Sequence, residues 1–113
     1  SIYQLVAYDI THGDIVGFAD AGPARRHVPY AGELYAIYIV DRAKRYGLGQ
    51  DMMERVQAYF ARSEMRSMIV WVLDNNHHAR RFYEAMGGRT GSRLSTTVGG
   101  FPVVELSYVW DPM

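Results

Sequence analysis

KRYGLGQ, at residues 44–50, follows the apolar run ELYAIYIV (residues 33–40) and precedes DMMERVQAYFAR (residues 51–62). The apolar run is typical of a strand buried on both faces. Apolar side chains then repeat at four-residue spacing from Leu48 to Phe60, which predicts a helix that ends near residue 62. A strand, a turn with two glycines and a helix N-terminus together form an anion-binding device, because unpaired backbone N–H groups converge there.

Length and composition limit the class of protein. The chain of 113 residues is expected to form one domain, 1–113, and its 49% hydrophobic content is ample for a packed core. Twelve basic and twelve acidic side chains cancel, so the charge gives no support for binding to nucleic acid or to a membrane surface. The absence of cysteine excludes disulfides, thiolate catalysis and cysteine-ligated zinc. No apolar run has membrane-spanning length, and a cytoplasmic location is expected.

The remaining pattern predicts a mixed α/β sheet in the order β-β-β-α-β-α-β-β. The other expected elements are strands at residues 2–9, 14–21, 67–73, 89–97 and 101–110, a loop at 22–32, and a helix that is capped by residues 74–76 and stops at Gly87. Two strands lead into helices, and we expect them to splay apart. Ligands in α/β sheets bind at the carboxyl ends of such strands, so a ligand slot is predicted there.

A second motif lies in residues 74–88, DNNHHARRFYEAMGG. Together with residues 37–49, IYIVDRAKRYGLG, it resembles the GNAT superfamily of N-acetyltransferases. The acetyl-CoA loop of that family follows the pattern Arg/Gln-x-x-Gly-x-Gly/Ala, and its later segment reads Asn-x-x-Ala-x-x-Phe-Tyr-x-x-x-Gly-Phe. Both motifs occur here in family order, separated by one helix and one strand. The sequence departs from the family pattern at Lys44, in place of Arg or Gln, and at Gly88, in place of Phe.

The resemblance implies a GNAT-like acyl-CoA N-acyltransferase fold and direct transfer of acetyl from acetyl-CoA to a primary amine. In the family, the backbone of the glycine turn binds the pyrophosphate, and the end of the preceding strand pairs with the pantetheine arm. One N–H group of that strand end faces the thioester oxygen. The cofactor-binding residues implied here are Ile39, Val40, Lys44, Arg45, Tyr46, Gly47, Leu48, Gly49, Gln50 and Asn76.

Two residues are candidates for proton transfer. Tyr83 matches the family position of the acid that protonates the leaving sulfur, although its place on the apolar stripe of its helix also suits a core aromatic residue. Glu33 lies eleven residues before Lys44, the offset of the general-base glutamate in the histone acetyltransferase branch. Poor solvation at the start of an apolar strand is expected to make the carboxylate a stronger proton acceptor, which suits a base for an ammonium substrate. The alternatives for Glu33 are a solvated strand end or an ion pair with Arg25 or Arg26, and a water chain can replace a direct base.

The remaining residues bear on metal binding, on subunit contacts and on the acceptor. His77 and His78 are adjacent on a helix and point in different directions, so no metal site is expected. The apolar strand over residues 103–110 is expected to lie at a sheet edge and to pair with a second subunit in a homodimer. No acidic cluster is visible that would indicate a polyamine, and the acceptor therefore stays open among small-molecule and peptide amines.

The N-terminal region leaves two functional interpretations. The family fold opens with a strand and two helices before its first hairpin, whereas this sequence starts at the hairpin. Those helices form one wall of the acceptor site, so the chain is expected either to be a fragment or to receive that wall from a partner. Two functions are therefore open. The chain is either an active N-acetyltransferase or a truncated module that binds acyl-CoA without turnover and acts as a sensor or in interactions. A phosphate-binding domain unrelated to acetyl transfer would leave the motif at residues 76–83 unexplained.

Overall fold

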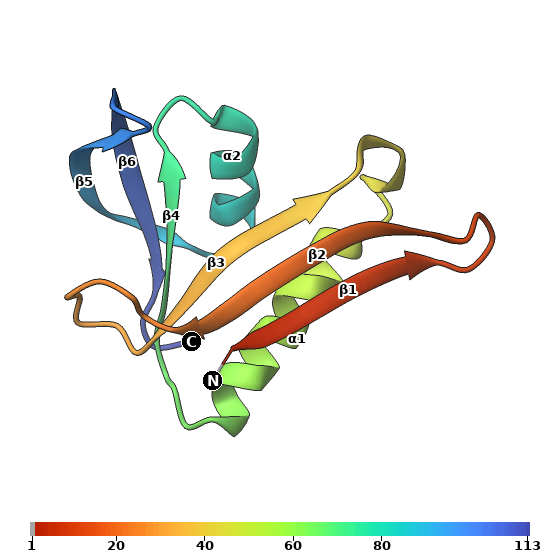
Figure 1. Cartoon of the computed structure of the whole chain (residues 1–113). Coiled ribbons are helices and arrows are strands. Elements are labelled where there is room, and N and C mark those ends of the chain that lie inside the picture. Colours follow the sequence, from red (N-terminus) through yellow and green to blue (C-terminus); the bar gives the residue numbers. More distant parts are fainter. Residues whose placement is uncertain (1) are drawn as a thin grey trace.

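The computed structural model describes residues 2–113 and has the expected order of helices and strands. The elements are β1 (Tyr3–Asp9), β2 (Asp14–Pro23), β3 (Gly32–Ile39), the 3₁₀ helix η1 (Asp41–Ala43), α1 (Leu48–Arg62), β4 (Met68–Leu73), α2 (His77–Ala85), β5 (Arg89–Val98) and β6 (Phe101–Trp110) (Figure 1). Within these residues the strands form one sheet in the order β1-β2-β3-β4-β6-β5. The strand β2 is longer than expected and shortens the predicted loop at residues 22–32 to residues 24–31.

The parallel strands β3 and β4 diverge soon after they meet. Among the described residues they pair only at Gly32 with Met68 and at Glu33 with Ile69. At the start of β3, Gly32 permits close packing against α1, since a Cβ atom there would lie 2.6 Å from Cε1 of Phe60. Beyond Glu33, β3 continues beside β2 and β4 continues beside β6. The predicted splay of the two central strands is thus confirmed, and it opens toward their carboxyl ends.

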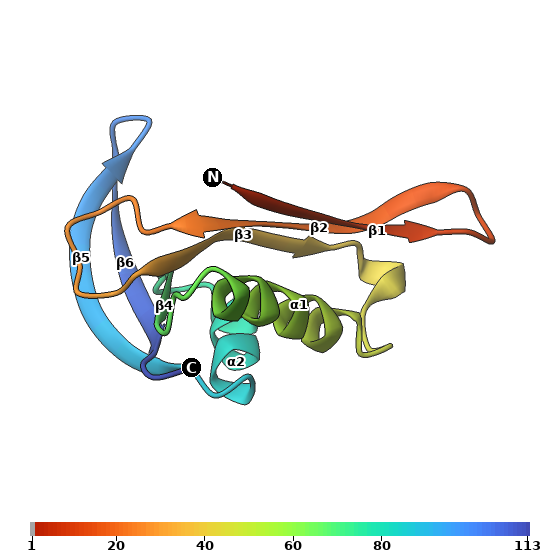
Figure 2. The ribbon, with the colours of Figure 1, turned by 90° about the horizontal axis from the view of Figure 1, so that it is seen from below.

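Both helices lie on one face of the sheet (Figure 2). The predicted apolar stripe of α1 packs against the strands through four buried side chains, Met52, Met53, Val56 and Phe60. The prediction that residues 33–40 are buried on both faces is wrong for their second half. Leu34 is buried, whereas Tyr38 is exposed beside Phe18, with ring centroids 6.1 Å apart. The reason is that neither helix of the described residues covers that face of β1–β3.

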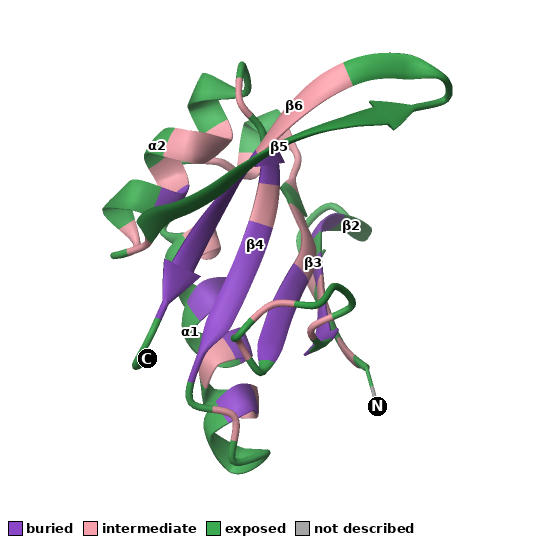
Figure 3. Cartoon of the chain, turned by 90° about the vertical axis from the view of Figure 1, so that its left-hand side faces the viewer, coloured by how far each residue is buried: buried purple, intermediate pink, exposed green. Residues whose placement is uncertain are grey.

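The closing hairpin does not leave β6 at an edge of the sheet. β6 pairs with β4 on one side and with β5 on the other, so its backbone groups are already used. The prediction that residues 103–110 form an edge strand for a second subunit is therefore wrong. The edges of the sheet in residues 2–113 are β1 and β5, and β5 is exposed along its whole length (Figure 3). In the same part of the chain, no helix has the length and apolar character needed to cross a bilayer.

Candidate active site

The glycine turn between β3 and α1 contains two residues with left-handed backbone. The φ angle is 70° at Arg45 and 77° at Gly47, and a positive φ is uncommon for a residue with a side chain. A Cβ atom at Gly47 would meet nothing within 4 Å, whereas one at Gly49 would lie 2.9 Å from Cε1 of Phe82. Gly47 therefore faces open space, and Gly49 is needed for the close packing of α1 against α2.

The N-terminus of α1 has unused backbone donors. Gly47 is the N-cap residue, and no side chain caps this end of the helix. The first backbone hydrogen bond of the helix runs from the Asp51 N–H to the Gly47 carbonyl at 3.0 Å. The N–H groups of residues 48–50 therefore have no acceptor within the helix. The carboxylate of Asp51 pairs with Arg55 at 3.0 Å, which offsets its negative charge. These donors and the helix dipole suit a phosphate group.

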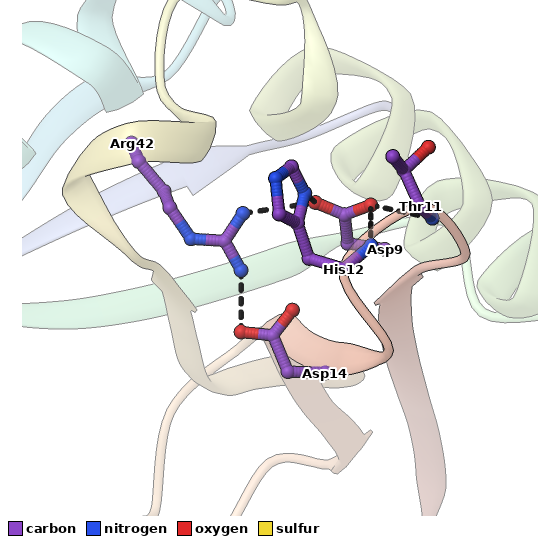
Figure 4. A network of polar contacts seen from close by, with 5 residues as sticks. All are labelled: Asp9, Thr11, His12, Asp14 and Arg42. Carbon is purple, nitrogen blue, oxygen red and sulfur yellow. Dashed lines mark hydrogen bonds and ion pairs between the residues drawn. The ribbon is translucent and has the colours of Figure 1, made fainter.

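An open hollow of about 650 Å³ lies beside the turn, and Tyr46, Gly47 and Leu48 form part of its lining. Across the hollow, Arg42 donates to Asp9 at 2.8 Å and also to Asp14 (Figure 4). These contacts tie the β1–β2 turn to η1, directly before the glycine turn. Sequence reasoning missed Arg42 because its two partners lie far away along the chain.

Asp9 links this network to His12, whose Nδ1 atom lies 2.8 Å from Oδ2 of Asp9. The Arg42 guanidinium first, and then His12, hold the pKa of the Asp9 carboxyl well below its usual range. A carboxyl with a lowered pKa stabilises the fold at pH values above its unfolded pKa of about 3.9, and this contribution is lost as the pH falls toward the folded pKa.

We therefore expect the Asp9→Asn variant to melt at a lower temperature than the wild type at neutral pH. The difference in Tm should shrink steadily as the pH falls below about 4, because protonation removes the same charge from the wild type. Thermal unfolding of both proteins between neutral and acidic pH measures this. A difference in Tm that is independent of pH would contradict the assignment.

The N–H group of Val40 is already used by the sheet. It donates to the Val16 carbonyl of β2 at 2.9 Å, so of Ile39 and Val40, one of which was predicted to direct its N–H group at the thioester, only Ile39 remains a candidate. N–H groups alternate between the two sides of an antiparallel strand, and those of Ile39 and Ile37 therefore point away from β2. Ile37 was missed because the apolar run alone does not reveal which alternate set faces the splay.

Lys44 and Asn76 make local contacts. Nζ of Lys44 pairs with Asp41 at 2.9 Å, which leaves its backbone as the part directed at the turn. Oδ1 of Asn76 accepts the Ala79 N–H at 3.2 Å, and the predicted capping of the second helix is thereby confirmed. The side-chain amide nitrogen of Asn76 makes no hydrogen bond among the described residues, so it is the group that a ligand would meet.

Tyr83 lies in the core, as its place on the apolar stripe predicted. Its ring centroid is 5.6 Å from that of Phe82, 5.8 Å from that of Tyr108 and 6.3 Å from that of Trp110. Burial raises the pKa of Tyr83 to about 12. The hydroxyl group therefore stays protonated at neutral pH, which is the state that a proton donor needs.

Glu33 is buried, and Arg25 occupies both of its carboxylate oxygens. The backbone N–H of Arg25 donates to Oε1 of Glu33 at 3.0 Å, and Nη2 of the Arg25 guanidinium donates to Oε2 at 2.9 Å. The ion pair that the sequence left open as an alternative is thus observed. Action as a base would require the exposed Arg25 side chain to move away from Glu33.

A second cavity, of about 210 Å³, lies where β3 and β4 part. Its lining residues are Arg25, Arg26, Glu33, Tyr35, Trp71, Val72, Leu73 and Glu105. Of the predicted site residues, Glu33 lines this cavity, three residues of the glycine turn line the first hollow, and Tyr83 lines neither. No group of three or more His, Asp or Glu side chains in residues 2–113 is arranged to hold a metal ion.

Comparison with known proteins identifies the family. The profile described as the acetyltransferase (GNAT) family matches residues 2–88. The chain belongs to the GNAT acetyltransferase family. The GNAT chain is 30% identical over 102 residues to YuaI of Bacillus subtilis, described as an uncharacterized N-acetyltransferase. That match covers 89% of this chain but 58% of the relative, so the chain spans less than two thirds of the relative's length.

Solved structures confirm the GNAT fold. The TM-score is 0.78 with Arabidopsis thaliana NAA60 in complex with a bisubstrate analogue, at 19% identity, covering 96% of this chain and 74% of that one. It is 0.76 with yncA of Salmonella typhimurium with its cofactor acetyl-CoA, at 16% identity, covering 98% of this chain and 65% of that one. At these identities the likeness establishes the arrangement of the strands and helices of this GNAT chain.

Proposed function

We propose that this GNAT chain transfers acetyl from acetyl-CoA to a primary amine. One observation carries the proposal: the uncapped N-terminus of α1, with Gly47 facing open space, follows the strand β3 that parts from β4. Family membership supports acetyl-CoA as the donor, and yncA, a structure of the same fold, contains acetyl-CoA. The lack of cysteine is compatible with a reducing compartment such as the cytoplasm.

In this proposal the backbone of the chain binds the donor. The N–H groups of residues 48–50 hold the pyrophosphate, and the N–H groups on the parted edge of β3, at Ile37 and Ile39, pair with the pantetheine arm. An N–H group there also stabilises the negative charge that develops on the carbonyl oxygen. The amide nitrogen of Asn76 contacts the same arm from the start of α2.

Two side chains then move protons. The amine nitrogen attacks the thioester carbon, and the carbon–sulfur bond breaks with its electron pair left on sulfur. The attacking nitrogen loses one proton to Glu33, directly or through water, once Arg25 has moved. The Tyr83 hydroxyl donates a proton to the leaving thiolate and regains one from solvent, so that the products are an N-acetylated amine and CoA.

Calorimetric titration tests the donor site first. We expect the purified chain to bind acetyl-CoA and free CoA with micromolar affinity and to bind no ATP, because the turn lacks the glycines and the lysine of a nucleotide triphosphate loop. The comparison with ATP separates recognition of CoA from general attraction to phosphates. Absence of binding for both CoA species would overturn the proposal.

A second candidate function is acyl-CoA binding without turnover. It is favoured by the occupation of both Glu33 oxygens by Arg25, since this contact blocks the candidate base. If acetyl-CoA binds but no amine in a broad panel is acetylated, as measured by release of free thiol, this second function is the one that stands.

A further inference from the structure

The cavity at the strand splay contains a cation from the protein's own loop, at residues 24–31. Nη2 of Arg25 lies 2.9 Å from Oε2 of Glu33, and the guanidinium carbon lies 4.1 Å from the centroid of the Tyr35 ring. A carboxylate and the face of an aromatic ring both attract a positive charge. Glu33 and Tyr35 thus form one complete cation position.

The next residue of the loop repeats this arrangement. Nη1 of Arg26 lies 2.8 Å from Oε2 of Glu105, and its guanidinium carbon lies 4.4 Å from the centroid of the Trp71 ring. The two carboxylates and the two aromatic rings that contact these arginines come from β3, β4 and β6. All four side chains line the same cavity. The cavity therefore contains two cation positions, each built from one carboxylate and one aromatic ring.

The two glutamates are far less exposed than the two arginines that pair with them. The side chains of Glu33 and Glu105 are 4% and 14% exposed, whereas those of Arg25 and Arg26 are 62% and 42% exposed. A buried carboxylate needs a positive partner at all times. An exposed arginine on a loop is a partner that another cation can replace, because the exchange leaves neither carboxylate unpaired.

The second position is incompletely satisfied. Nε1 of Trp71 is buried without a hydrogen-bond partner among the described residues. Oε2 of Glu105 is also buried and accepts no hydrogen bond there, since its 2.8 Å contact with Arg26 is an ion pair with poor hydrogen-bond geometry. Buried polar groups are usually paired, so Oε2 of Glu105 can accept a hydrogen bond from a donor that is better aligned than Arg26. Nε1 of Trp71 is a donor, and an ammonium group cannot accept from it.

We propose that this cavity is the acceptor site and that it selects a small aliphatic amine carrying a second positive charge. Arg25 and Arg26 occupy the two cation positions until the acceptor displaces them. This inference rests on the proposed function: the reacting amine takes the position at Glu33 as an ammonium group, and the second cation takes the position at Glu105. The ammonium group loses one proton through Glu33 to solvent before its nitrogen attacks, and the attacking nitrogen then loses its second proton as proposed above. A volume of about 210 Å³ suits a small amine, and the cavity opens between β3 and β4, where the pantetheine arm is proposed to lie.

Binding of two matched amines tests the selection. The probes are 1,4-diaminobutane and 1-aminobutane, titrated calorimetrically into the chain with CoA present. We expect the diamine to bind at least about tenfold more tightly, because only the diamine replaces both arginines. Glu105→Gln should abolish that preference, whereas Glu54→Gln, a matched change at an exposed position of α1, should keep it.

The competing arginine gives an independent test. Arg26→Gln should raise the affinity for the diamine severalfold, because the position at Glu105 no longer holds a cation of its own. Arg62→Gln, at the exposed end of α1, is the matched control and should leave that affinity unchanged. If Glu105→Gln does not fold, as judged by thermal unfolding, the comparison of Arg26→Gln with Arg62→Gln decides alone.

The outcomes separate this inference from the proposed function. Equal binding of the two amines by the wild type, or an unchanged preference in Glu105→Gln, overturns the inference. Diamine preference in binding without acetylation of either amine supports the two cation positions in the cavity, but it contradicts the proposed function and with it the assignment of the cavity as the acceptor site. Acetylation of both amines with equal KM contradicts the inference and leaves the proposed function in place.

Discussion

Replacement of Tyr83 by Phe is expected to lower kcat for acetyl transfer by about 10²-fold, the lower end of the usual contribution of a general acid. The change removes one oxygen and keeps the ring, whose centroid lies within 5.6 to 6.3 Å of three other aromatic rings. The core and the binding of acetyl-CoA should therefore be retained. The thiolate would then leave without a proton donor, which raises the barrier of the step in which the carbon–sulfur bond breaks.

Steady-state kinetics and calorimetric titration of the same variant test this prediction. Tyr38→Phe is the matched control, because Tyr38 is exposed on the face of the sheet opposite the helices. Burial raises the pKa of Tyr83 to about 12, so its ionisation should cause no loss of the wild-type rate between neutral pH and about pH 10. If Tyr83→Phe turns over as fast as the control, Tyr83 is a core residue and the acid lies elsewhere.

Replacement of Gly47 by Val is expected to weaken the binding of acetyl-CoA by about a hundredfold. A φ of 77° costs a β-branched residue about 1–2 kcal/mol, which disfavours the turn. The new side chain would also stand in open space, where no protein atom lies within 4 Å and where the phosphates approach in our proposal. The two effects act on the same backbone donors, and the loss should appear in the dissociation constant of free CoA as well.

Gly100→Val is a matched control for backbone strain. Gly100 has a φ of 80°, also has no atom within 4 Å of a Cβ position, and lies in the turn between β5 and β6. Thermal unfolding should reveal similar losses of stability in both variants, whereas calorimetry should reveal weaker CoA binding in Gly47→Val alone. Unchanged CoA affinity in Gly47→Val would mean that the turn only connects β3 to α1.

Local patterns in the sequence determined the elements and the family. The four-residue apolar spacing predicted α1, and the polar residues before α2 predicted its cap, because both depend on contacts within a few residues. The two motifs are short and lie around the splay, so the resemblance to GNAT enzymes could be recognised before the fold was known. The identity of the glycines predicted the turn for the same reason, since a left-handed backbone is a local requirement.

The tertiary structure decided which partners these residues have. It assigned the Val40 N–H to β2 and placed β6 inside the sheet, because strand order and register depend on the pairing of distant segments.

The cavity between β3 and β4 depends on the same kind of distant contact. No acidic cluster is visible along the sequence, yet the sheet places Glu33 and Glu105 in one cavity, each beside an aromatic ring and an arginine. Hydrophobic spacing and turn chemistry act over a few residues and can be seen in the sequence. Charges separated by most of the chain meet only when strands from different segments pair.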